Sequence, residues 1–307
     1  MARSGTPSAE ASLGAVGSLA ALVEAMRPKQ WTKNAVVFAA FVFGGKLLDV
    51  RSMVTVVVAT GLFCLTSSTV YLFNDLLDAD ADRHHPLKRK RPIASGRLSP
   101  AMARVAIVAL MLIVFPAAAL IKPLFAAVLL TYVALMLAYT FRLKHLVIVD
   151  VFVIAAGFVL RAAAGAVVIG VPISPWLYVC TVLLSLFVGF AKRRHELVLL
   201  DDNAAAHRRI LDDYSPELLD ELIAVVSAAT IMAYSLYTFS APNLPANHSM
   251  MLTIPFVVYG IFRYLFLVHR KNGGGAPEQV LLDDFPLLGS LMLWGLVAAI
   301  ILYAPWH

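Results

Sequence analysis

Residues 53–82 read MVTVVVATGLFCLTSSTVYLFNDLLDADAD, in which a long apolar run ends directly in an acidic cluster. In a helix, about 20 mostly apolar residues cross the roughly 30 Å hydrocarbon core of a bilayer. The cluster from Asn74 to Asp82 would therefore lie at one end of a membrane-spanning helix. Ionisable groups beside an apolar span are energetically costly and usually functional. This stretch predicts a membrane fold and marks the place where its chemistry would occur.

Similar apolar runs continue through the rest of the chain. Of its 307 residues, 60% are hydrophobic and 14% are charged, against about 25% charged in an ordinary soluble domain, which excludes a soluble globule. Because the spans fill most of the chain, we expect a cytoplasmic tail and interfacial helix at 1–33 and a single transmembrane domain at 34–307. We expect an all-α, polytopic membrane bundle with nine transmembrane helices, over 34–50, 53–73, 101–120, 123–141, 147–169, 174–191, 219–240, 250–268 and 286–304.

The lysines and arginines predict the orientation of these spans, because cytoplasmic loops of membrane proteins carry an excess of them. If the N-terminus is cytoplasmic, all but four of the 25 lie in predicted inside segments; the four others are Lys46, Arg51, Lys122 and Arg161. We expect a multi-pass protein of the cell membrane, with the N-terminus and the acidic cluster in the cytoplasm and the C-terminus outside. The net charge of +6 is then a topology signal, and no nucleic-acid partner is expected.

The acidic cluster has the spacing of a metal site. On a helix, Asp75, Asp78 and Asp82 are spaced i, i+3, i+7, which places three carboxylates on one face. Carboxylates this close repel one another unless a cation lies among them, and Mg²⁺ commonly bridges such carboxylates to substrate phosphates. Asn74 could orient a carboxylate or a metal-bound water. The alternative, a solvated acidic helix end, is disfavoured by the adjoining apolar span.

Lysines and arginines cluster on the predicted cytoplasmic side, where the acidic cluster also lies. This arrangement fits a substrate with several phosphates. Lysine and arginine neutralise phosphate oxygens, although any single one here is more often a topology signal than a binding residue. Asp150 and Arg161 are about three helical turns apart on one expected helix and would share a face. The candidate binding residues are Lys33, Asn34, Arg83, Lys88, Arg91, Tyr139, Lys144, Asp150, Arg161, Lys192, Arg193 and Glu196.

The pattern Asn74-Asp75-x-x-Asp78-x-x-x-Asp82 resembles the N-D-x-x-D-x-x-x-D signature of the UbiA superfamily of intramembrane prenyltransferases. The resemblance covers nearly the whole chain and implies the all-helical fold of that family. It also implies that these aspartates hold Mg²⁺ on a diphosphate leaving group.

One stretch departs from the usual pattern of the family. Its aromatic prenyltransferases carry a second aspartate-rich motif after the sixth span, where this chain has Lys192-Arg193-Arg194-His195-Glu196. With this change, the chain resembles the branch of decaprenyl-phosphate phosphoribosyltransferases. That resemblance implies a glycosyltransferase whose donor is 5-phosphoribosyl 1-diphosphate and whose acceptor is the membrane lipid decaprenyl (polyprenyl) phosphate. The product would feed arabinan synthesis for the cell wall.

The sequence leaves two other functions open. A prenyltransferase with a prenyl diphosphate donor and an aromatic acceptor would use the same first aspartate motif. A transporter would explain charges such as Asp150 and Arg161 inside a span, although nine spans do not divide into two equal repeats. A homo-oligomer is also compatible with the sequence.

Overall fold

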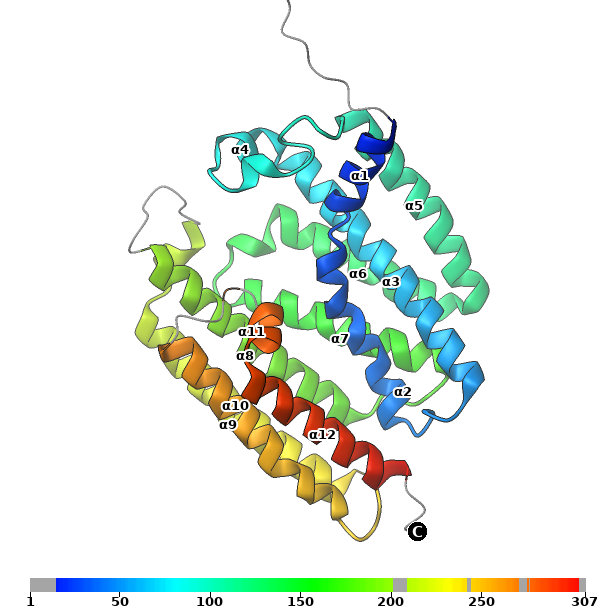
Figure 1. Ribbon diagram of the computed structural model, residues 1–307, viewed down its shortest axis with the longest axis vertical. Coiled ribbons are helices and arrows are strands. Elements are labelled where there is room, and N and C mark those ends of the chain that lie inside the picture. The colour runs from blue at the N-terminus through cyan, green and yellow to red at the C-terminus, as the bar shows by residue number, and fades with distance from the viewer. Residues whose placement is uncertain (1–14, 201–208, 242–243, 271–274, 276, 304–307) are drawn as a thin grey trace, which may run out of the picture.

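The computed structural model describes residues 15–200, 209–241, 244–270, 275 and 277–303, and Figure 1 shows their arrangement. All the secondary structure in these ranges is helical. Eight of the helices are long and apolar enough to span a membrane, which confirms the prediction of an all-helical membrane bundle. They are α3 (Val50–Leu77), α5 (Pro100–Ile121), α6 (Pro123–Phe141), α7 (Val149–Ile169), α8 (Pro175–Leu200), α9 (Pro216–Ser240), α10 (Ile254–Arg270) together with the η6 turn that precedes it, and α12 (Phe285–Tyr303).

Proline and serine determine where several of these spans begin. Pro100, Pro123 and Pro216 occupy the first turns of α5, α6 and α9, where a proline loses no helix hydrogen bond. The hydroxyls of Ser99 and Ser215 accept hydrogen bonds from backbone N–H groups of the first turns of α5 and α9, as helix caps do. These local signals place the starts of the helices close to their predicted positions.

The first predicted span, 34–50, has a different form. A 3-10 helix, η1 (Pro28–Phe38), leads into a short α-helix, α2 (Ala39–Phe43), and together they run through the bundle beside α7 (Figure 1). The helix stops before a glycine pair in which Gly45 has φ 71, a left-handed conformation that ends helices. The chain thus crosses the bundle here as an irregular segment, and eight rather than nine of the described passes are regular spanning helices.

η1 packs on α7 through direct contact between the two backbones. A Cβ atom on Gly165 of α7 would lie 1.9 Å from the carbonyl oxygen of Val37, so only glycine fits there. Small residues allow helices in membranes to approach this closely. The contact also buries an irregular backbone whose polar groups lipid could not satisfy.

Gly165→Ala is therefore expected to destabilise the bundle by about 1–3 kcal/mol, the usual range for an overpacked core. Gly61→Ala on α3 is the matched control, since no atom lies within 4 Å of its added Cβ and alanine stabilises a helix over glycine by about 0.5–1 kcal/mol. The measurement is the midpoint of thermal unfolding in detergent. Equal midpoints for the two variants would contradict the backbone contact.

Four apolar clusters form the core of the described residues, and α7 contributes to two of them. Val151 of α7 packs in a cluster with residues of α8, α9, α10 and α12. Ala164 of the same helix packs in a cluster with α2, α3, α5, α6 and η1. Large apolar side chains on the outer surface stay exposed, such as Leu112 (70%) and Leu120 (88%) of α5. An outer surface of this kind suits contact with lipid rather than water.

The interfacial helix predicted within residues 1–33 corresponds to α1 (Ala15–Ala25). Ala21 is buried where α1 packs on α3. Arg97 binds both carboxylate oxygens of Glu24, at 2.6 and 2.8 Å, and this hydrogen bonding holds the pKa of Glu24 below its ordinary value. α1 is thus docked on the bundle, and η1 runs across the predicted domain boundary. The tail before α1 lies outside the described residues.

The remaining short helices are α4 (Ala79–His84), α11 (Pro277–Asp283), η2 (Lys88–Lys90), η3 (Leu143–His145), η5 (Arg209–Asp213) and η6 (Ser249–Thr253). α4 and the C-terminal part of α8, both predicted to be cytoplasmic, lie at the same end of the bundle (Figure 1). At the opposite end, the hydroxyl of Tyr303 donates to the carbonyl of Val42 at 2.6 Å. The predicted outside position of His307 concerns a residue outside the described ranges.

Candidate active site

The acidic cluster lies where α3 ends. Asp78 separates α3 from α4, and the Asp82 N–H donates to its carbonyl at 2.8 Å. Asp75 and Asp82 are buried, with 2% and 3% exposure, whereas Asp78 is half-buried. Thr140 of α6 donates to Asn74 Oδ1 at 2.7 Å. The end of α3 is therefore held by a neighbouring helix next to two buried carboxylates.

Two arginines bind these carboxylates. Arg27 Nη2 donates to Asp75 Oδ1 at 2.5 Å. Arg91 Nη1 lies 2.6 Å from Asp82 Oδ2 and 3.2 Å from Asp75 Oδ1. Because one guanidinium nitrogen contacts both carboxylates, their oxygens face a common point. The structure thus brings the predicted residue Arg91 to the acidic cluster.

The donor atoms at this point suit a divalent cation. Mg²⁺ prefers oxygen ligands and is commonly held by one or two carboxylates together with substrate phosphates, a set that Asp75 and Asp82 can supply. Among the described residues, no three Asp, Glu, His or Cys side chains converge as a metal site on their own. Of the three predicted carboxylates, Asp75 and Asp82 thus share one arginine, whereas Asp78 lies half-buried at the junction of α3 and α4.

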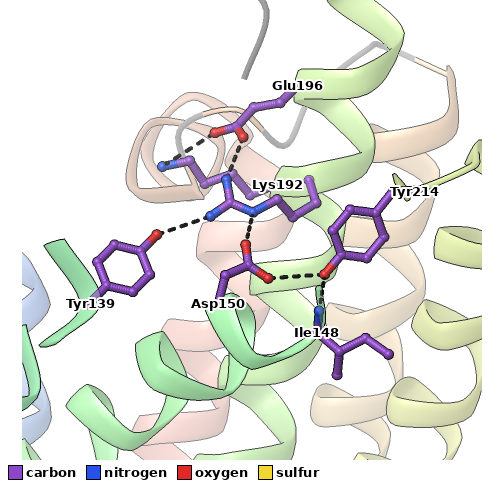
Figure 2. Close-up of polar contacts among 7 residues, drawn as sticks. Tyr139, Ile148, Asp150, Lys192, Glu196 and Tyr214 are labelled. Atoms are coloured by element: carbon purple, nitrogen blue, oxygen red, sulfur yellow. Dashed lines mark hydrogen bonds and ion pairs between the residues drawn. The ribbon is translucent and has the colours of Figure 1, made fainter. Parts of the chain in front are cut away.

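A second polar centre surrounds Arg193 of α8 (Figure 2). Its buried guanidinium, 2% exposed, donates to Asp150 Oδ2 of α7 at 2.7 Å, to Glu196, and to the Tyr139 hydroxyl of α6 at 3.3 Å. Lys192 Nζ lies 4.0 Å from Glu196 Oε1. Two carboxylates thus balance two cations, and α6, α7 and α8 meet at this point. All five of these residues were predicted as binding residues.

Tyr214, which follows η5, completes the second centre. Its hydroxyl donates to Asp150 Oδ1 at 3.0 Å and accepts from the Ile148 N–H at 2.6 Å (Figure 2). Ile148 has φ 67, an outlier for a β-branched residue, and this hydrogen bond helps to hold it. Burial raises the pKa of Tyr214 to about 12, so the hydroxyl remains a donor at neutral pH. Sequence spacing does not link Tyr214 to Asp150, and the residue was not predicted.

The sequence of this chain matches a known protein family. Residues 34–283 match the UbiA prenyltransferase family. The chain belongs to this family. A decaprenyl-phosphate phosphoribosyltransferase of Corynebacterium glutamicum is 35% identical over 280 residues, which cover 89% of this chain and 84% of that protein. A protein of the same name from Mycobacterium tuberculosis is 35% identical over 282 residues, covering 90% of this chain and 92% of its own.

A solved structure agrees with the fold of this UbiA protein. A UbiA homolog from Archaeoglobus fulgidus bound to GPP and Mg²⁺ has a TM-score of 0.70 and 17% sequence identity, and the match covers 92% of this chain and 99% of that one. At this identity, the likeness concerns the arrangement of helices. It confirms the UbiA-like bundle implied by the sequence resemblance.

In this UbiA protein, Arg161 lies apart from both polar centres. It donates to Asn34 Oδ1 at 2.8 Å, to the Gly157 carbonyl at 2.8 Å and to the Tyr132 hydroxyl at 3.0 Å. Asp150 lies at the start of α7, about 16 Å along the helix from Arg161 at 1.5 Å per residue. The structure therefore does not bring Arg161 or Asn34 to the acidic cluster, and the pair instead joins η1 to α6 and α7.

Four predicted cations remain. Arg83 pairs with the exposed Asp80 at 2.7 Å, with its own side chain 52% exposed, and Lys88 is exposed on η2. Both side chains are exposed at the surface, as expected of cations that only determine the orientation of the spans. Lys33 of η1 and Lys144 of η3 are half-buried. The structure therefore leaves Arg83 and Lys88 outside the two centres.

Arg27 is the main site residue that the sequence interpretation missed. It lies seven residues before the predicted span 34–50, in a region where a single arginine is typical of the positive-inside signal. A usable signal was nevertheless present in residues 27–34, RPKQWTKN, which place several polar side chains at the entrance of an apolar segment. Polar groups in that position are expensive unless they have partners, and Arg27 has one in Asp75.

Proposed function

We propose that this protein transfers the 5-phosphoribosyl group of 5-phosphoribosyl 1-diphosphate to decaprenyl (polyprenyl) phosphate and releases diphosphate. The observation that carries the proposal is the match, over about nine-tenths of the chain, to relatives named decaprenyl-phosphate phosphoribosyltransferase. The second centre supports it, because Lys192 and Arg193 stand where aromatic prenyltransferases of the family are expected to have acidic residues. The lipid product would serve the synthesis of cell-wall arabinan.

The reaction needs charge stabilisation rather than proton transfer. The acceptor is a phosphate monoester that is anionic at neutral pH, so the nucleophile exists without a general base. Held by Asp75 and Asp82, Mg²⁺ would supply positive charge to the departing diphosphate. Arg27 and Arg91 lie beside these carboxylates and can donate charge-assisted hydrogen bonds to the same leaving group. Asn74 can orient the neighbouring Asp75 carboxylate.

Lys192 best fits the additional phosphate of the donor. Arg193 is balanced by Asp150 and Glu196, so turning it toward a substrate would leave those carboxylates uncompensated. Lys192 is 39% exposed and lies 4.0 Å from Glu196, a long ion pair that contributes little. Its ammonium can therefore turn to the 5-phosphate at small cost. Arg193 has the role of positioning the end of α8 that carries Lys192.

Membership of the UbiA family favours a transferase over the transporter that the sequence left open. Within the family, the alternative is a prenyltransferase with an aromatic acceptor. We further propose that the acidic cluster and the N-terminus face the cytoplasm, since the cationic loops gather at that end, and that the C-terminus lies outside. We also propose that the protein forms a homo-oligomer, which the mass of the purified protein in detergent tests.

A single assay tests the reaction. Purified protein with Mg²⁺ receives donor labelled in the ribose, together with polyprenyl phosphate, and we expect label to enter the lipid fraction while diphosphate is released. A parallel reaction contains a prenyl diphosphate and an aromatic acid, and we expect no product there. Prenylated aromatic product without ribosyl lipid would overturn the proposal in favour of the alternative.

A further inference from the structure

The backbone at Arg27 adopts a conformation that its sequence does not favour. Arg27 has φ 55 and ψ 61 at the junction between α1 and η1. Glycine is the usual residue in this left-handed conformation at the end of a helix. The following residue is Pro28, which normally keeps its predecessor extended. An arginine in this position implies that its side chain has a task that glycine could not perform.

The Arg27 side chain covers the buried carboxylate of Asp75. Its guanidinium lies 4.9 Å from the centre of the Tyr71 ring and 2.5 Å from Asp75 Oδ1. Tyr71 and Asp75 are four residues apart on α3 and therefore share a face. Arg27 is 29% exposed, whereas Asp75 is 2% exposed. The guanidinium thus lies between the buried carboxylate and the surroundings.

The backbone on both sides of Arg27 is fastened to α3. The Ser68 hydroxyl donates to the Met26 carbonyl at 2.9 Å, and Trp31 Nε1 donates to the same hydroxyl oxygen at 3.0 Å. These contacts hold the main chain of the junction in place. The long Arg27 side chain can therefore change partners without a movement of α1 or η1.

Asp75 Oδ1 contacts two guanidinium groups, those of Arg27 and Arg91. A divalent cation at this oxygen would compete with both for the same lone pairs and would be repelled by their charge. We propose that Arg27 is an exchangeable counter-ion, whose guanidinium moves from Asp75 to the diphosphate of the donor when donor and cation bind together. The inference rests on the proposed function, in which Asp75 and Asp82 hold Mg²⁺.

This exchange makes binding of the cation and of the diphosphate mutually dependent. While Arg27 remains on Asp75, the cation binds weakly, and the diphosphate has one fewer arginine to bind. When both ligands bind, the guanidinium gives up its hydrogen bond to the carboxylate and donates hydrogen bonds to two phosphate oxygens instead. By linkage, each ligand must raise the affinity for the other by the same factor. Arg27 would therefore disfavour binding of the cation without its substrate.

The test measures binding rather than turnover. Mn²⁺ binding to the purified full-length protein is followed by the loss of the free Mn²⁺ signal in electron paramagnetic resonance, with and without inorganic diphosphate. We expect Arg27→Gln to bind Mn²⁺ alone about tenfold more tightly than wild type, because a competing charged hydrogen bond is removed. We expect the same variant to bind labelled diphosphate, at saturating Mn²⁺, about tenfold more weakly.

Arg97→Gln is the matched control. It removes the ion pair of α1 with Glu24 without touching Asp75, so it loosens α1 and should change neither affinity. Arg27→Lys keeps the charge, and we expect it to bind Mn²⁺ alone with an affinity between those of wild type and Arg27→Gln, which tests the exchange if the glutamine variant does not fold.

Opposite changes in the two affinities support the exchange, since a purely structural role would weaken both. If wild-type protein binds Mn²⁺ and makes the ribosyl lipid, but Arg27→Gln binds Mn²⁺ no more tightly than wild type, the exchange is wrong. The proposed function would then still stand. Wild-type protein that binds no Mn²⁺ even with diphosphate would overturn the metal assignment and the exchange together.

Discussion

Asp75→Asn is expected to lower kcat/KM for formation of the ribosyl lipid by about 10²- to 10³-fold, the range for loss of one charge-stabilising group at a reacting centre. Asparagine keeps the size of the side chain and removes the charge that Arg27 and Arg91 contact. It also removes one of the two carboxylates that would hold Mg²⁺. The two arginines are 29% and 27% exposed, so water can solvate them and the protein should stay folded. Initial rates at saturating Mg²⁺, together with the thermal midpoint, measure both effects.

Asp80→Asn is the matched control for this variant. Asp80 belongs to the same acidic sequence, but it is 91% exposed and pairs with Arg83 at the surface. We expect its kcat/KM to stay within about twofold of wild type, because an exposed ion pair contributes little. Wild-type activity of Asp75→Asn, or an equal loss in Asp80→Asn, would contradict the assignment of Asp75.

Removal of divalent cations should lower activity at least as much as the loss of Asp75. EDTA is expected to abolish formation of the ribosyl lipid, and excess Mg²⁺ should restore it, since the reaction depends on neutralising the departing diphosphate. The measurement is the rate before and after Mg²⁺ is added back. A rate that is insensitive to EDTA would show that Arg27 and Arg91 stabilise the leaving group on their own.

Hydropathy predicts most of the fold, because a helix that crosses lipid must be long and apolar whatever its neighbours are. This reasoning identified the spans that became α3, α5 to α10 and α12. It misjudged the form of residues 34–50, since the shape of η1 depends on Gly165 of α7, a contact between segments far apart in sequence. The spacing of apolar and polar residues along the chain carries no information about such a contact.

The candidate site was likewise predicted only in part from the sequence. Asp75 and Asp82 were predicted from their spacing on one chain segment, and both are buried at the end of α3. Their arginine partners come from the start of η1 and from beyond α4, which no spacing rule connects to them. Lys192 and Glu196 were correctly paired as i and i+4 neighbours, but Arg193 binds Glu196 more closely. That choice depends on Asp150, which α7 brings beside α8.

The largest effect on stability is expected from Arg193→Met, which should lower the free energy of unfolding by about 3–5 kcal/mol, the cost of removing one partner from a buried ion pair. Asp150 is fully buried, so its carboxylate would lose its main counter-charge while the Tyr214 hydroxyl alone stayed bound to it. Unfolding in mixed detergent micelles measures the change. Asp150→Asn combined with Arg193→Met should recover part of the loss, because the uncompensated charge is then gone.

Arg194→Met tests whether burial, rather than charge alone, causes this effect. Arg194 is the next residue of α8 and also binds a carboxylate, that of Asp220, but Asp220 is 38% exposed. An ion pair in contact with water contributes about 0–1 kcal/mol, so this variant should unfold almost like wild type. If Arg193→Met and Arg194→Met destabilised the protein equally, Arg193 would not hold α6, α7 and α8 together. Lys192 would then have no fixed support at the end of α8, and its assignment to the 5-phosphate would lose its structural basis.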